Sequence, residues 1–322
     1  MFNFAFYKTL FFLNTNTYKA HLALLAANLI YGVNHIIAKG VMPDKIGPSA
    51  FVFLRVLVAG ILFWIIKSFV KEKVKKKDFI LLIFCGLFGI TANMMLFFHG
   101  LSMTSPIDAS IIMTATPVLV LILSVFILKE PLTTNKIIGI TIGALGAFLL
   151  IWYGKKAIGT SSSLGNLLIF LNACSYSLYL VLVKPLMKKY KPFTIISWVF
   201  LFGFIFMFPF GIEDLLATDF SAFTTHTYLT IAFVILGTTF LTYLFNIYAL
   251  TIVSPSVNGS YIYLQPVISF LMVGLYAYLF NQTEYSQDIN AIKIISCVLV
   301  VIGVYLISKK PSQKIMKSKI DT

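Results

Sequence analysis

GLSMTSPIDASIIMTATPVLVLILSVFILKEPLTTNKIIGITIGALGAFLLI, residues 100–151, decides the fold of this chain because a weaker copy of it begins at Ala249. A shift of 149 residues superimposes three features of the two copies: Gly100-Leu101 on Ala249-Leu250, Ser105-Pro106 on Ser254-Pro255, and Pro117 on Pro266. Both copies are too apolar for a soluble loop, and each continues into a further apolar run that ends in GAFLLI or GVYLIS. A repeat on this scale sets the architecture of a protein.

The composition is that of a membrane protein. The chain is 59% hydrophobic and 11% charged, and its mean hydropathy is +0.93, far from the values of a soluble domain. Its net charge of +14 comes from short lysine blocks between apolar segments, which argues for membrane orientation signals and against nucleic-acid binding. Cys85, Cys174 and Cys297 lie inside apolar runs without the spacing of a metal site. We therefore predict an integral membrane protein without a disulfide framework, metal or cofactor.

Ten apolar segments meet or approach the roughly 20 residues that a membrane-spanning helix needs. They cover approximately residues 20–40, 49–69, 79–101, 106–128, 135–153, 165–187, 193–212, 227–251, 255–280 and 289–308. Ten spans are preferred to nine because no Asp, Glu, Lys or Arg occurs between Asp219 and Glu284, and Pro255 divides that stretch. Residues 1–18 contain Lys8 and no small-residue cleavage site, so they are predicted to form an interfacial or loose tail, with a signal peptide as the alternative.

The lysines are divided unequally between the two sides of the predicted membrane domain. Nineteen lie on the side that holds both termini and five on the other. Because cytoplasmic loops carry the excess of positive charge, both termini are predicted to be cytoplasmic, in a multi-pass protein of the inner (plasma) membrane. The block KEKVKKKD, residues 71–78, is then a solvated cytoplasmic loop, with contact to lipid headgroups as the alternative.

Each copy of the repeat contains five of the predicted spans. A shift of 145 residues also matches the first spans of the copies, placing Tyr31 on Tyr176 and Lys39 on Lys184. An odd number of spans inverts the second copy relative to the first. The predicted fold is therefore all-α and integral to the membrane, with ten transmembrane helices in two inverted five-helix repeats. The predicted organisation is an N-terminal tail (1–18), a first repeat (19–153), a linker loop (154–164), a second repeat (165–308) and a basic cytoplasmic tail (309–322).

Several short motifs accompany this repeat. They are Phe53-Leu54-Arg55, the two Ser-Pro pairs with their following prolines, LKEPL at residues 128–132 and GALG at residues 143–146. With them, residues 20–308 resemble the EamA-type permeases of the drug/metabolite transporter superfamily. The second repeat departs from that pattern at residues 281–285, where the family has Gly-Glu-Pro-Leu, and at Gln265, where the family often has Glu. The resemblance implies a ten-helix transporter, in many members an exporter of amino acids or other small metabolites from bacterial cells.

Polar and aromatic side chains at membrane depth mark the candidate binding site, because they are costly unless they face protein or a water-filled cavity. They occupy single helical faces in several spans, and the faces recur in both repeats. The candidate substrate-binding residues are Asn28, Tyr31, Asn93, Phe97, Met113, Thr116, Asn172, Tyr176, Tyr179, Thr242, Asn246 and Gln265. An aromatic cage with amide and hydroxyl groups suits a small amphipathic solute. The alternative is that these groups only tie helices together.

A second set of residues is predicted to act in gating or coupling. It comprises His35, Arg55, His99 and Asp108, which map to the outer half, and the two repeated prolines, Pro117 and Pro266. The histidines with a nearby carboxylate suggest a proton-sensitive outer gate. Arg55 either anchors helix packing or binds an anion. The prolines each remove a backbone hydrogen bond, so they are either hinges or static kinks.

Two classes of function remain. The first is a secondary transporter, an exporter working by alternating access on a small-molecule substrate; the related alternative is a lipid-carrier flippase. The second is a membrane-embedded enzyme that uses His35, His99 and Asp108 on a lipid-borne substrate. Paired polar faces favour transport, because an enzyme needs one asymmetric site. Membrane lipids are the other expected partners, and Gly139 and Gly143 form a small-residue face that serves either packing within a monomer or a weak homodimer.

Overall fold

The structure is a computed structural model of the 322-residue chain. It describes residues 15–39, 41–42, 44–104, 109, 112–152, 162–265, 267–268, 271 and 291–308, which contain helices and no strand. The α-helices of this part are α2 (Thr15–Lys39), α3 (Pro48–Ser68), α4 (Phe79–Gly86), α5 (Ala92–Met103), α7 (Thr116–Leu128), α8 (Thr134–Trp152), α9 (Ser163–Met187), α10 (Pro192–Leu216), α11 (Thr225–Phe233), α12 (Thr242–Ile252), α13 (Pro255–Ser260) and α16 (Ala291–Ser308).

Five helical segments of the described chain are long and apolar enough to cross a membrane. They are Pro48–Ser68, Lys76–Met103, Ser163–Met187, Pro192–Leu216 and Thr225–Ile252. Two shorter apolar helices, Thr116–Leu128 and Ile294–Ser308, accompany them. The all-helical membrane class is confirmed by these elements. The count of ten spans and the inversion of the repeats stay predictions at this point.

Two of the long segments contain a wide π-helical turn. In Lys76–Met103 it is η2 (Leu87–Thr91), between α4 and α5, and in Thr225–Ile252 it is η4 (Val234–Leu241), between α11 and α12. With the shift of 149 found in the sequence, residues 87–91 fall on residues 236–240, inside η4. Such turns are rare and occur often at functional sites.

Prolines begin several helices, where their missing N–H has no intrahelical partner to lose. Pro48 and Pro192 open α3 and α10. Pro117, predicted to lie near the middle of a span, lies in the first turn of α7, after a turn at Thr114 and Ala115. It therefore removes no hydrogen bond from a helix interior, and the expected mid-helix kink at this position is absent. Pro266 lies outside the described residues.

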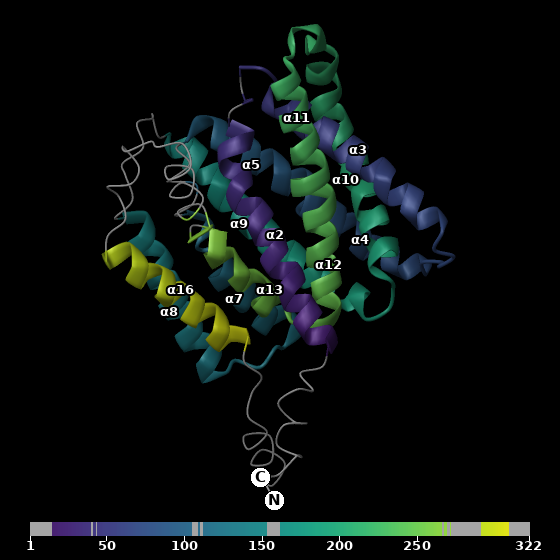
Figure 1. Ribbon diagram of the computed structural model, residues 1–322. Helices are drawn as coiled ribbons and strands as arrows, with labels where there is room; N and C mark the ends of the chain where they lie inside the picture. The colour runs from purple at the N-terminus through teal and green to yellow at the C-terminus, as the bar shows by residue number, and fades with distance from the viewer. Residues whose placement is uncertain are drawn as a thin grey trace, which may run out of the picture.

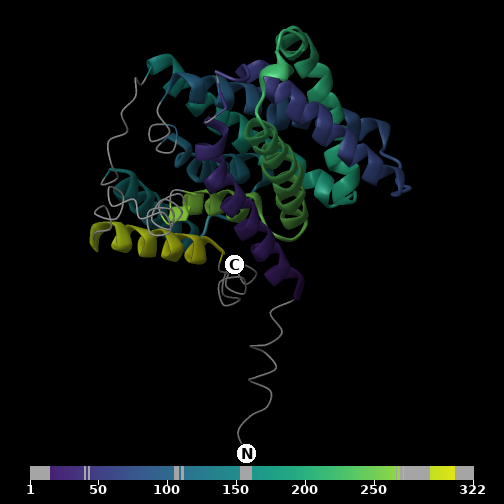
Figure 2. The ribbon, with the colours of Figure 1, turned by 45° about the horizontal axis from the view of Figure 1, so that its top comes forward.

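The helices pack in pairs, α3 with α10, α2 with α12, α5 with α9 and α8 with α16 (Figure 1). The main apolar core lies among α3, α5, α9, α10 and α12, and a second core joins α13 to α8 and α16. Figure 2 shows the α2 and α12 helices running alongside one another. The small-residue face of α8 packs on α16 of the same chain: a Cβ atom on Gly303 would come within 2.6 Å of the Gly143 backbone. This face thus packs within one chain.

One end of the bundle gathers lysines and is called here the lysine-rich end. It contains the end of α3, the connection through residues 71–78, and the turn between α9 and α10. Lys189 donates to Asp78 across 2.7 Å, and the Tyr190 hydroxyl donates to the same carboxylate, also across 2.7 Å. These contacts tie the KEKVKKKD block of the first repeat to the second repeat.

Candidate functional site

A cavity of about 80 Å³ lies between helices of both halves of the chain. It offers room for several water molecules. Its walls come from α2, α3 and α5 in the first half and from α9, η4, α12 and α13 in the second. Nine of the twelve predicted binding residues line it: Asn28, Tyr31, Asn93, Phe97, Met113, Asn172, Tyr176, Asn246 and Gln265.

The other three predicted binding residues lie behind the cavity wall. Thr116 is fully buried, and its carbonyl accepts a hydrogen bond from Ser177. Tyr179 stacks over Gly89 so closely that a Cβ atom there would lie 2.4 Å from its ring, which draws this tyrosine into the core. Thr242 donates to the Thr238 carbonyl within its own helix, across 2.6 Å, and is a hydrogen-bond partner of Tyr31. These positions support the wall without lining the cavity.

The amide groups of the cavity also connect helices. Gln265 donates from Nε2 to Oδ1 of Asn28 across 2.9 Å, which joins the second repeat to α2. Asn172 donates from Nδ2 to the Asn93 carbonyl across 2.7 Å, which joins α9 to α5. The two interpretations left open by the sequence, cavity lining and helix tying, are therefore both realised by the same side chains.

Arg55 is part of the cavity wall. Its side chain is buried, with an exposed fraction of 3%. Its Nε donates to the Thr239 hydroxyl across 2.9 Å, and the guanidinium carbon lies 4.4 Å from the centre of the Phe98 ring. Such cation–π contacts contribute about 2 kcal/mol where water is excluded. Arg55 thus points into the protein, and does not extend toward the membrane surface.

Sequence reasoning missed several lining residues. Tyr243, Thr238, Asn34, Asn258 and Phe98 belong to this group. Tyr243 and Thr238 correspond, at the shift of 149, to Met94 and Gly89, so a search for polar faces that recur in both repeats discards them. Thr238 also lies in the π-helical turn, which breaks the 3.6-residue spacing used to draw a helical face. Its hydroxyl contacts Oδ1 of Asn34 at 3.1 Å.

The structure describes only some of the remaining residues predicted to act in gating. His99 lies on α5 outside the cavity lining, and its Nε2 is 3.0 Å from the Ser49 hydroxyl. Asp108 lies outside the described residues, as does the side chain of His35. The proton-sensitive outer gate therefore stays a prediction.

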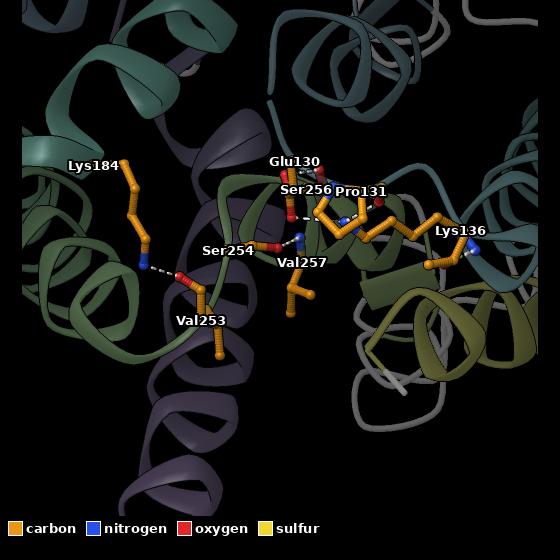
Figure 3. A network of polar contacts seen from close by, with 9 residues as sticks. Glu130, Pro131, Lys136, Lys184, Val253, Ser254, Ser256 and Val257 are labelled. Atoms are coloured by element: carbon orange, nitrogen blue, oxygen red, sulfur yellow. Dashed lines mark hydrogen bonds and ion pairs between the residues drawn. The ribbon is translucent and has the colours of Figure 1, made fainter. Parts of the chain in front are cut away.

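A second polar centre lies where the connection between α7 and α8 meets α13 (Figure 3). Glu130, just after α7, accepts hydrogen bonds from Ser256 of α13 and from Lys136 of α8, each across 2.7 Å. Burial raises the pKa of Glu130, but hydrogen bonds from Lys136, Ser254 and Ser256 outweigh it and hold the pKa below its ordinary value. Lys184 of α9 donates to the carbonyl of Leu250 in the last turn of α12 and to that of Val253, the residue after this helix. These residues are called here the end network.

The fold and the cavity together define a class, a multi-pass helical membrane protein with a polar chamber built from both halves of its chain. The chain belongs to the EamA-like transporter family, whose sequence model matches residues 18–152 and again residues 163–309. The resemblance first noted in the motifs is thereby confirmed.

Two proteins with similar sequences are named as transporters. The uncharacterized transporter YetK of Bacillus subtilis is 28% identical over 298 residues, which cover 90% of this chain and 88% of YetK. The uncharacterized transporter YyaM of the same organism is 26% identical and covers 88% of this chain and 92% of YyaM. A crystal structure with 16% identity matches with a TM-score of 0.69 over 94% of this chain and 99% of its own, which supports the fold alone. The protein is therefore a membrane transporter.

Proposed function

We propose that the chain is a secondary transporter that exports amino acids or similar small metabolites across the bacterial plasma membrane by alternating access. The observation that carries this proposal is the cavity, because its amides and aromatic rings come from corresponding helices of the two repeats. Asn93 and Phe97 of α5 face the same space as Asn246 of α12, their partner helix at the shift of 149. Such a chamber binds a small amphipathic solute at the interface of two units that can move against each other.

Helix pairing supports the inverted repeat. The shift places α2 opposite α9 and α5 opposite α12, so the packed pairs α2–α12 and α5–α9 exchange under a two-fold rotation. The pairs α3–α10 and α8–α16 each join a helix to its own counterpart. With the lysine-rich end in the cytoplasm, as the lysine distribution predicts, the end network joins the two units on the cytoplasmic side. Opening that side requires the Glu130–Ser256 contact to break.

Inside-out vesicles provide the test. Vesicles carrying the protein are screened for uptake of radiolabelled amino acids and related metabolites, with and without a proton gradient. The double variant Tyr176→Ala, Gln265→Ala removes two lining groups and is expected to lower uptake by roughly tenfold or more. Tyr305→Ala is the matched control, because Tyr305 is 63% exposed on the outer face of α16. If vesicles with and without the protein take up every solute of a broad panel equally, the proposal is wrong.

An apolar groove favours the lipid flippase as the second candidate. It has a volume of about 550 Å³ and lies between α2, α10 and α12, and its lining includes Lys19, Leu22, Ala26, Phe193 and Leu244. A groove of this lining fits an acyl chain next to a basic group for a lipid phosphate. Movement of a fluorescent phospholipid between leaflets, measured in the same vesicles, separates the two functions. We expect none above the protein-free rate.

A further inference from the structure

Arg55 is the only charged residue among those that line the cavity in the described chain. Neither of the ion pairs of the described residues, Lys136–Glu130 and Lys189–Asp78, includes Arg55. Among the described residues, the ionisable groups that act electrostatically on Arg55 are the phenols of Tyr31 and Tyr243. The described part of the cavity thus carries one uncompensated positive charge.

The hydrogen bond that the Arg55 guanidinium makes within the described residues involves Nε and neither of the two terminal nitrogens. Nε is occupied by Thr239, and the rings of Phe98 and Phe51 lie 4.4 and 5.5 Å from the guanidinium carbon. Nη1 is buried and has no hydrogen-bond partner within the residues described. With Nε taken, the terminal nitrogens are the ones left to bind a planar anion end-on, which is the fork geometry that arginine offers to a carboxylate.

A buried arginine without a carboxylate partner is costly in a membrane protein, because it keeps its proton under all physiological conditions. A role in packing alone does not account for it. Pro48 and Pro192 both open their helices, and with this shift of 144 residues Arg55 falls on Val199, so the second unit packs at the equivalent place without a charge. The positive charge of Arg55 is therefore a feature of the cavity, and the packing of the repeat does not require a charge at this position.

An acceptor without a partner lies on the same cavity. Oδ1 of Asn172 is buried and has no hydrogen-bond partner in the described structure, while its Nδ2 is committed to the Asn93 carbonyl. A free donor at Arg55 and a free acceptor at Asn172 are complementary to a solute that carries an anion and an N–H group. An amino acid in its zwitterionic form has both.

We propose that Arg55 is the carboxylate subsite of the chamber, so that the protein selects solutes with a free carboxylate and rejects their amides. This inference rests on the transport function proposed above and narrows its substrate class. In the bound state, the terminal nitrogens of Arg55 donate to the two carboxylate oxygens. The Phe97 and Phe98 rings contact the apolar part of the solute.

The experiment measures binding to the full-length protein in lipid nanodiscs by titration calorimetry. Three matched pairs are used as probes: L-phenylalanine and L-phenylalaninamide, L-leucine and L-leucinamide, benzoate and benzamide. We expect at least one acid to bind, its amide to bind roughly tenfold to a hundredfold more weakly, and Arg55→Gln to remove that preference. Arg55→Lys keeps the charge without the fork and is expected to retain a weaker preference. A folded Arg55→Gln protein that keeps the full preference overturns the inference.

Two further arms separate the possible failures. If inside-out vesicles take up a neutral or cationic solute equally well with wild type and Arg55→Gln, transport stands and the carboxylate subsite is refuted. If Arg55→Gln and Asp108→Asn each destabilise the protein and the double variant restores it, Arg55 is paired within the chain and the inference also fails. If acids bind as expected but no solute of the panel crosses the membrane, the subsite stands and the transport function is the part that fails.

Discussion

The central cavity and the end network differ in how completely their polar groups are satisfied. In the end network, Glu130 receives hydrogen bonds from Ser256 and Lys136, and Lys184 donates to two carbonyls at the end of α12. In the cavity, Nη1 of Arg55 and Oδ1 of Asn172 have no partner among the residues described. Satisfied buried groups hold a conformation, whereas unsatisfied ones are expensive and persist where something binds. From this comparison we expect the end network to contribute stability and the cavity to contribute recognition.

The largest expected effect on stability comes from breaking the end network. About a tenth of the Lys136 side chain is exposed in the wild-type protein. Glu130→Ala removes the ion-pair partner of Lys136 and the hydrogen-bond acceptor of Ser256. Loss of one partner from a buried pair costs about 3 kcal/mol. We expect the free energy of unfolding in detergent to fall by about that amount, as measured by denaturant titration. Glu130→Gln keeps an acceptor for Ser256 and should lose less; equal stability of Glu130→Ala and wild type would show that the network is not structural.

Arg55→Gln is expected to raise the free energy of unfolding, whereas Glu130→Ala lowers it. It removes a buried charge that has no carboxylate partner in the described chain, so the ligand-free protein should gain about 1–2 kcal/mol while losing its affinity for acids. Thermal unfolding of ligand-free protein measures the gain. A large loss of stability would mean that Arg55 is satisfied within the chain, and the contrast between the two regions would disappear.

Acid titration tests the end network without a mutation. Because the pKa of Glu130 is lowered from its ordinary 4.5, its contribution to stability is complete above that value and is lost as the pH falls through the lower pKa of the folded state. We expect the stability difference between wild type and Glu130→Gln to be constant from about pH 5 to pH 8 and to shrink below that range. The effect is smaller than that of Glu130→Ala, because a protonated carboxyl still bonds to Ser256.

The sequence predicted the cavity better than it predicted the end network. Polar residues on recurring faces are visible without a structure, and nine of those chosen line the cavity. Tyr179 and Thr116 lie on the same helices but behind the wall, because the approach of Tyr179 to Gly89 depends on packing between helices that no spacing reveals. Glu130 appears in the sequence only as part of the LKEPL motif, residues 128–132. Its partner Ser256 is 126 residues away, and nothing local indicates that contact.

The role of Arg55 could not be decided from the sequence alone. Its position in an apolar span indicates that it matters, but the sequence alone leaves both helix packing and anion binding open. The choice depends on which of its nitrogens already has a partner, and that is decided by Thr239, 184 residues later in the chain. The π-helical turn that precedes α12 contains this threonine and shifts the helical phase around it.

The smallest expected effect concerns the backbone that presents Glu130. Lys129 ends α7 in the left-handed conformation, with φ 53° and ψ 37°, and the Glu130 N–H bonds to the Ser124 carbonyl across 3.1 Å. A side chain is disfavoured there and glycine is not, so Lys129→Gly should stabilise the protein by about 0.5–1 kcal/mol. Lys129→Ala keeps the Cβ atom and is the control, expected to give no gain. Because the Lys129 side chain is exposed, a loss of stability in both variants would show that the lysine itself supports the end network. A gain in Lys129→Gly alone would show that the network depends on the turn and on Glu130, as the geometry predicts.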